Sequence, residues 1–208
     1  MRYDHIAGQN VERLAALSDG IFAVAMTLLV LDLHVPTTDL SHGLRALIPP
    51  FVMYLMSFMT LGIFWIGQQT QLNQLARANR SQTWMHLLFL FGISLMPFST
   101  RLLAEFPKSR IALLWYWANI LLAGIALYVS WICALKLKLL KPDIPAEVPE
   151  AIKRRIVVAQ SLYACGALLS MVNTYWSIAW IVLVQLNFVL AMPFRLARFE
   201  RPHRPVGE

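Results

Sequence analysis

Charged residues are scarce in this chain: Lys, Arg, Asp and Glu together make up 14% of its 208 residues. A soluble domain usually contains about 25% of these four residue types. Hydrophobic residues make up 58% of the chain and stand in long runs, as they do in proteins that cross a bilayer. The low charge therefore argues against a soluble domain and places the chain among integral membrane proteins.

Cysteine is also rare, and the motifs of common catalytic and metal sites are missing. The two cysteines, Cys133 and Cys165, both fall inside apolar runs, which argues against a disulfide framework. The sequence has no His/Cys spacing typical of a metal site, no phosphate-binding loop and no Gly-x-Ser-x-Gly turn. We therefore expect neither an enzyme nor a bound cofactor or metal.

Six apolar runs are each long enough to cross a bilayer as a helix. They predict transmembrane helices at about 14–34, 48–70, 84–104, 111–135, 156–173 and 175–194. Because these runs account for most of the chain, we expect one all-α membrane domain over residues 1–208 and no separate soluble domain. The first run is too long for the apolar part of a signal peptide, and it lacks a small-residue cleavage site before Pro36.

Prolines and polar links indicate where these helices begin and end. Pro49–Pro50 is expected to open the second helix, where missing amide donors do little harm. Pro97 is expected to kink or end the third helix. The links 35–47 and 136–155 are interpreted as a short link and a long cytoplasmic loop, and the last two helices are expected to meet in a tight turn near Asn173–Thr174.

The net charge of +7 is distributed unevenly between the two sides of the predicted bundle. With a cytoplasmic N-terminus, fourteen of the eighteen Lys and Arg residues lie on the cytoplasmic side, and the other side holds only Arg45, Arg101, Lys108 and Arg110. This asymmetry follows the positive-inside rule and places both termini in the cytoplasm. The basic tail from Arg195 would favour anionic lipid headgroups, so no nucleic-acid partner is needed to explain the charge.

One face of the first predicted helix carries a long apolar stripe. At about 100° per residue, this stripe consists of Leu17, Gly20, Ile21, Val24, Thr27, Leu28, Leu31 and Val35. Its spacing is that of a heptad seam, which packs against another helix. The partner is either another helix of the same subunit or copies of the first helix around a central axis, where apolar rings can form a constriction and gate by dewetting. Thr27 carries the only side-chain hydroxyl on this face.

Polar residues near both ends of the first helix need partners, because acidic groups are costly in a membrane span. Asp19 lies about 140° from Val24 around the helix and therefore points away from the stripe. We expect Ser18 and Asp19 to join a buried hydrogen-bonded cluster that orients the helix. Natural partners for Asp19 lie at the same depth on the next two helices: Gln68, Gln69 and His86. Asp32 is expected to be a solvated helix end, and a ring of this residue at an outer mouth would concentrate cations.

The first three helices resemble a known family. Arg13-x-x-x-Leu17-Ser18-Asp19, followed by GIFAVAMTLLVLDL, resembles the Arg-x-x-x-Phe-Ser-Asp signature of the transmembrane protein 175 potassium channels. The likeness continues in FWIGQQ (64–69) and MHLLFLFGISLMPFST (85–100). This sequence departs from the family pattern at Leu17, where the signature has phenylalanine, at Gln68–Gln69, where the family often has histidines, and at His86, where it often has asparagine.

The resemblance implies a homotetramer of six-helix subunits in the bacterial inner membrane, with the first helix of each subunit around the pore axis. It implies a potassium-selective cation channel that does without the usual carbonyl filter, with potassium ions as the permeant species. By the same resemblance the constriction maps to Val24, with Thr27, Leu28 and Leu31 further along, and Arg13, Ser18 and Asp19 map to the packing cluster.

Two other functions are compatible with the residues alone. The first is a small proton-coupled transporter that uses Asp19 as its proton site. The second is a non-conducting membrane scaffold, in which the stripe of the first helix serves only for packing. Ser18, Asp19 and His86 also have the composition of a hydrolase triad, but the sequence offers no oxyanion device to accompany them.

Overall fold

The computed structural model describes residues 10–33 and 40–199. Within these residues the chain is helical, and its only β pairing is an isolated bridge between Leu75 and Leu140. The helices are α1 (Val11–Val30), α2 (Leu40–Ala46), α3 (Ile48–Leu72), α4 (Arg80–Ser94), α5 (Met96–Glu105), α6 (Arg110–Lys136), α7 (Glu147–Leu169) and α8 (Thr174–Phe199). The all-α fold class predicted from the sequence is therefore confirmed.

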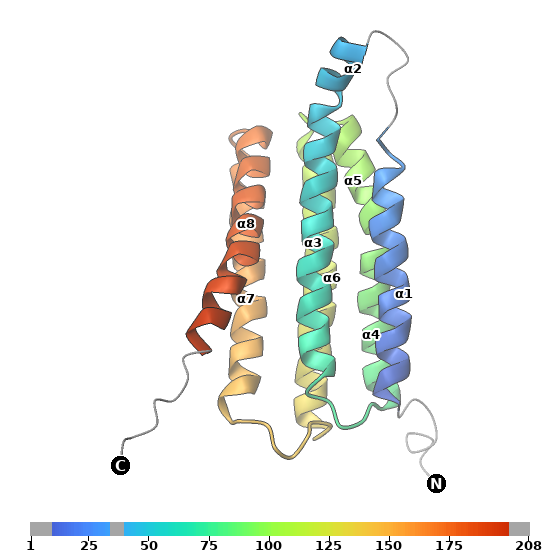
Figure 1. The fold of residues 1–208 in the computed structure, drawn as a ribbon, viewed down its shortest axis with the longest axis vertical. Helices are drawn as coiled ribbons and strands as arrows, with labels where there is room; N and C mark the ends of the chain where they lie inside the picture. The colour runs from blue at the N-terminus through green and yellow to red at the C-terminus, as the bar shows by residue number, and fades with distance from the viewer. Residues whose placement is uncertain (1–9, 34–39, 200–208) are drawn as a thin grey trace, which may run out of the picture.

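The long helices run along one common direction and form an elongated bundle (Figure 1). α3 and α6 lie in its middle, α1 and α4 lie on one side, and α7 and α8 form a pair on the other side. α4 packs against α6 and α1, while α3 packs against α1, α5 and α8. α1 is therefore held on one side only, by α3, α4 and α5.

Local sequence signals account for the helix starts. Asn10, Asn79 and Ser109 each adopt extended backbone angles just before a helix, and their side chains accept a hydrogen bond from the backbone N–H three residues later. These are N-caps, which satisfy one of the orphan amide donors of a first helical turn. They fix where α1, α4 and α6 begin.

Prolines act as predicted in α3 and in the third span. Pro49 and Pro50 occupy the first turn of α3. Pro97 lies in the first turn of α5, and the helix is interrupted at Leu95, between α4 and α5. Pro97 lacks the amide that would donate to the carbonyl one turn earlier, so the helical path bends here rather than ends.

Two links differ from the prediction. The link 35–47 contains a short helix, α2. This helix was not predicted, because its seven residues show only weak apolar periodicity. The loop predicted over 136–155 is shorter than expected, because α7 begins at Glu147. Glu147 and Glu150 stand in the first turn of α7, where acidic side chains interact favourably with the helix dipole. Apolar periodicity alone does not reveal a polar helical turn of this kind.

Four helical segments are long and apolar enough to cross a membrane: Val11–Val30, Ile48–Leu72, Arg80–Glu105 and Arg110–Lys136. They match the first four predicted spans. α7 and α8 occur where the fifth and sixth spans were predicted and meet in the expected turn before Thr174. Whether these two helices cross the membrane stays a prediction. Val35, Pro36 and the end of the basic tail, with Arg201 and Arg204, lie outside the described residues, as do the side chains of 191–199.

Candidate functional site

α1 has two faces with opposite environments. One face packs against the bundle, and its buried residues recur every three or four positions: Leu14, Ser18, Phe22, Ala25 and Leu29. The other face coincides with the predicted stripe and is open. The exposed fraction is 58% for Val24 and 70% for Leu31, and Leu17 and Leu28 are also exposed. Of the described stripe residues only Ile21 is half-buried and packs against the core of the subunit. Packing within the described part of its own subunit therefore does not account for the stripe, and that interpretation is wrong.

Small side chains shape the open face. Ala16, Gly20 and Ala23 are exposed there, and a Cβ added to Gly20 would meet no atom within 4 Å. A shallow groove follows the face between α1 and α4, lined by Ala16, Leu17, Gly20, Ile21, Val24, Ala25, Leu28 and Ser94. Small residues allow close approach of another helix in a membrane. The small residues on this face would thus allow another helix to pack closely against it.

Thr27 is exposed on the open face, and its hydrogen bonds determine whether its hydroxyl can donate to or accept from an outside group. Its Oγ1 lies 2.9 Å from the carbonyl oxygens of Ala23 and Val24, so the hydroxyl hydrogen is donated to the helix backbone. The lone pairs of Oγ1 stay available to an outside group. Thr27 therefore presents an acceptor oxygen, which suits a cation better than an anion.

Ser18, on the packed face of α1, belongs to a buried cluster with Gln68 of α3 and His86 of α4. Gln68 Nε2 donates to Ser18 Oγ at 2.7 Å, and Ser18 Oγ lies 2.7 Å from His86 Nε2. Gln68 Nε2 also lies 3.1 Å from His86 Nε2, and Ser18 Oγ lies 2.7 Å from the carbonyl of Leu14. All three side chains are nearly inaccessible to solvent. The cluster ties α1, α3 and α4 together.

Aromatic rings pack beside this cluster. The ring of Phe89 lies 6.1 Å from His86, 6.0 Å from Phe22 and 5.9 Å from Phe64, measured between centroids. These are spacings at which tilted aromatic pairs attract each other. The polar cluster therefore packs against apolar rings, which fix the positions of its side chains and exclude water.

Asp19 does not join that cluster. Its Oδ1 accepts hydrogen bonds from the indole Nε1 of Trp65 at 2.8 Å and from Nε2 of Gln69 at 2.9 Å, both on α3. Asp19 is exposed in the subunit, so the expectation of one buried cluster containing both Ser18 and Asp19 is wrong. Neighbouring helical residues point about 100° apart, and this separates the two networks. The direction predicted for Asp19, away from the stripe and toward a neighbouring helix, agrees with these contacts.

Arg13, which the family resemblance maps to the packing cluster, lies apart from both networks. It is exposed, and its backbone N–H donates to the side chain of Asn10, while its side chain is in neither the Ser18 nor the Asp19 network. A hydrolase triad is not assembled either, because Asp19 bonds Trp65 and Gln69 rather than His86. Within residues 10–33 and 40–199 no group of three His, Cys, Asp or Glu side chains could hold a metal ion.

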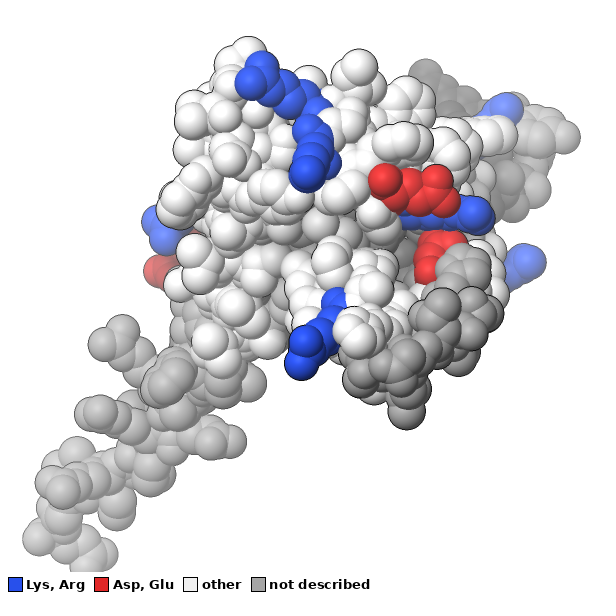
Figure 2. Space-filling view, turned by 90° about the horizontal axis from the view of Figure 1, so that it is seen from above, with Lys and Arg blue, Asp and Glu red and all other residues white. Residues whose placement is uncertain are grey.

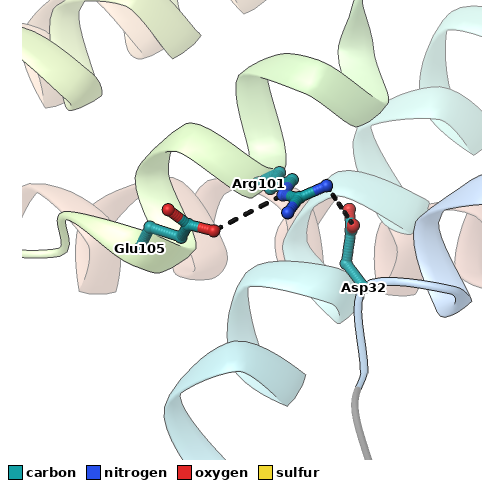
Figure 3. Close-up of polar contacts among 3 residues, drawn as sticks. All are labelled: Asp32, Arg101 and Glu105. Atoms are coloured by element: carbon teal, nitrogen blue, oxygen red, sulfur yellow. Dashed lines mark hydrogen bonds and ion pairs between the residues drawn. The ribbon is translucent and has the colours of Figure 1, made fainter.

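At the opposite end of α1, Asp32 takes part in an ion-pair chain with two residues of α5 (Figure 3). Its Oδ1 lies 3.9 Å from Nη1 of Arg101, and Nε of Arg101 lies 3.4 Å from Oε1 of Glu105. The Asp32 side chain is 27% exposed, so it is half-buried rather than fully solvated as expected. Its basic partner lies far along the chain, so local sequence patterns could not reveal the pairing.

Another buried polar network lies in the middle of the bundle and was not predicted. Tyr116 Oη of α6 lies 3.2 Å from Ser57 Oγ and 3.1 Å from Thr60 Oγ1 of α3. Thr100 of α5 donates to Ser57 at 2.7 Å, and Gln185 of α8 donates to Thr60 at 2.6 Å. The network links four helices inside one subunit. Its only signal in the sequence is a pair of hydroxyl residues one turn apart on α3, Ser57 and Thr60.

Comparisons with known proteins identify relatives of this chain. A family profile described as "Endosomal/lysosomal potassium channel TMEM175" matches residues 13–97, which span α1 to the start of α5. The chain is 30% identical over 194 residues to a potassium channel of Chamaesiphon minutus, covering 88% of this chain and 93% of that protein. It is 34% identical over 127 residues to a potassium channel of Streptomyces collinus, covering 57% of this chain and 62% of that one.

More distant similarity reaches animal proteins and a solved structure. The human protein, named as an endosomal/lysosomal proton channel, is 28% identical over 181 residues, and the match spans 36% of its length. The crystal structure of a lysosomal potassium-selective channel homologue from Chamaesiphon minutus has a TM-score of 0.77 and 27% identity, covering 87% of this chain and 97% of that one. The match to the crystal structure includes regions beyond residue 97, where the family profile ends.

Proposed function

Because this chain belongs to the TMEM175 family of membrane ion channels, we propose that it conducts potassium through a pore lined by α1 from four copies of the subunit. The bacterial relatives named above are potassium channels, whereas the animal relatives are named proton channels. The observation that carries the proposal is the open apolar face of α1. A single subunit leaves this face uncovered, so one subunit cannot enclose a pore with it.

The chemistry of the open face favours a pore over contact with lipid alone. Many apolar side chains on other helices are also exposed, as expected for a protein surrounded by acyl chains. The α1 face differs from them because it combines small residues with the hydroxyl of Thr27. Polar and charged groups inside a membrane usually face a protein interior or a water-filled path.

In the proposed tetramer, apolar rings form the constriction. Val24 makes the narrowest ring, and Leu28 and Leu31 make further rings toward the C-terminal end of α1. Rings of this kind close a pore by excluding water when they are narrow and dry. The Thr27 ring adds four acceptor oxygens among them, which can replace part of the hydration shell of a potassium ion and give the pore its preference.

The proposal also includes how the channel lies in its membrane. The subunit crosses a bacterial inner membrane six times with both termini in the cytoplasm, so that α1 starts on the cytoplasmic side. Lipid bilayer, monovalent cations and three further copies of the chain are then its partners. The networks of Ser18 and Asp19 fix the orientation of α1 against α3 and α4, which keeps each ring of side chains at one level of the pore.

Flux through purified protein in liposomes tests the proposal. We expect a potassium gradient to drive cation flux through wild-type protein, and the mass of the detergent-solubilised complex to be four times that of the subunit. An intact tetramer without flux would favour the scaffold. Monomeric protein without flux would contradict the proposed pore.

An Asp19→Asn variant separates the channel from a proton-coupled transporter. For the channel, Asp19 is an anchor, so the variant is expected to lose stability by about 1 kcal/mol through weaker hydrogen bonds and to keep its permeability ratios. A matched control is Glu12→Gln, which removes an exposed carboxylate from the same helix. Normal stability combined with loss of proton-coupled transport in the Asp19 variant would favour the transporter.

A further inference from the structure

We propose that Arg101 sets the conductance of the pore by partly neutralising Asp32 and Glu105 at the mouth where α1 ends. The inference rests on the proposed function, because it needs α1 to line a pore. It concerns a different property, the number of cations held at one mouth, and a residue that lies on α5 rather than on the pore helix.

The position of the three residues relates them to the proposed pore. Asp32 directly follows Leu31, the last described residue of the open α1 face, and α5 packs against α1. Figure 2 views this end of the bundle from above and shows acidic side chains on either side of a basic one, on the side where Figure 1 places α1 and α5. An α-helix with its side chains is about 10–12 Å across, so charges at the end of a pore-lining helix lie close to the pore axis.

The charges of the three side chains do not cancel. The Asp32 and Glu105 carboxylates both pair with one guanidinium, so the three side chains together contribute one net negative charge per subunit and four in the proposed tetramer. Without Arg101 the two carboxylates would contribute eight negative charges to the tetramer. Clefts lined by one sign of charge raise the local concentration of counter-ions, and for a cation pore this raises the rate at which ions enter.

The exposure of the ion pairs argues against a mainly structural role. The side chain of Arg101 is 59% exposed and that of Glu105 is 57% exposed. Ion pairs at such positions contribute little to stability, because water screens them and the long side chains lose freedom when they pair. Their field still reaches the solvent in front of the mouth, over a screening length of about 10 Å at 0.1 M salt. The main consequence of Arg101 is therefore electrostatic.

Single-channel recording of the full-length protein in bilayers tests this inference. Arg101→Gln is expected to raise the conductance for cations that enter at the α1 C-terminal mouth by about twofold at low salt, while the opposite direction changes less. At 1 M salt the screening length falls to about 3 Å, so the difference should largely disappear. Glu105→Gln is expected to change the conductance in the opposite direction.

Two control variants define the outcomes. Arg101→Lys keeps the charge and should conduct like wild type. Arg110→Gln removes another exposed arginine at the start of α6, which packs against α4, α5 and α7, and should have a smaller effect. Wild-type conductance in Arg101→Gln at low salt would overturn the inference, as would a Lys variant that behaves like the Gln variant. A wild-type protein that forms no channel would instead overturn the proposed function.

Discussion

The two faces of α1 differ in what surrounds them, although they alternate along the same 20 residues. The packed face is closed by three aromatic rings and by the Ser18, Gln68 and His86 cluster. The open face has small and aliphatic side chains and one hydroxyl, and most of these side chains are exposed in the described subunit. This difference indicates that substitutions on the packed face should damage the subunit, whereas those on the open face should change what the assembled protein does.

The largest effect is expected for Phe22→Ala on the packed face. Phe22 is fully buried against Phe89, and removing a buried aromatic ring costs about 3 kcal/mol or more through lost packing and the cavity that remains. Thermal unfolding in detergent should show a clear decrease in stability. Leu31→Ala, at an exposed position near the end of α1, is the matched control and should leave the midpoint nearly unchanged. Equal losses in the two variants would contradict the distinction between the faces.

Ser18→Ala should have the next largest effect. The change leaves Gln68 and His86 without the hydroxyl that both contact, and an unsatisfied buried polar group costs about 1–3 kcal/mol. Ser94→Ala is the matched control, because the Ser94 hydroxyl is exposed and donates only to a carbonyl of its own helix. Thermal unfolding of both variants measures the difference. If the Ser94 variant were the less stable of the two, the cluster would not be the anchor described above.

Val24→Ser should alter function with little change in stability. A polar side chain wets the apolar ring, so the cation leak through liposomes should rise several-fold. Val158→Ser makes the same change at an exposed valine of α7 and should leave the leak as in wild type. If Val24→Ser tetramers leaked no more than wild type, the constriction would have to lie elsewhere.

Thr27→Val is expected to have the smallest effect, and it sharpens the comparison within the open face. Loss of the acceptor oxygen should lower the permeability ratio of potassium to sodium by about twofold while assembly continues. Thr70→Val is the control, because the Thr70 hydroxyl also donates to a carbonyl of its own helix but lies on α3. Reversal potentials under potassium and sodium gradients measure the ratio. An unchanged ratio would exclude Thr27 from selectivity.

The sequence predicted the fold and one face of α1 well, because both depend on local periodicity. Apolar runs located the long helices, and about 100° per residue located Leu17, Val24, Leu28 and Leu31 on one side. Periodicity does not say what covers a face. Only the three-dimensional arrangement showed that the stripe lies open rather than packed within the subunit.

Partners that are distant along the chain could not be predicted in the same way. Hydrogen bonding between Asp19 and Trp65 depends on the relative rotation of α1 and α3. The pairing of Asp32 with Arg101 depends on how α5 is oriented after the interruption at Leu95. The sequence grouped Gln68, Gln69 and His86 by depth, which is correct, but assigned all three to Asp19. Gln68 and Gln69 are neighbours on α3 and therefore point in different directions around the helix, so that Gln68 contacts Ser18 and Gln69 contacts Asp19.

The open face of α1 also affects how the protein is made. Acyl chains solvate an apolar helix surface about as well as another apolar helix does, so a newly inserted subunit incurs little penalty while its stripe faces lipid. The contacts of its packed face and the hydrogen bonds of its internal networks form within one subunit. In the proposed tetramer, folding of the subunit and association of subunits are therefore separable steps in biogenesis. During association, neighbouring subunits replace lipid rather than water on the open face. The composition of the host membrane then becomes a variable that sets how much of the protein is assembled.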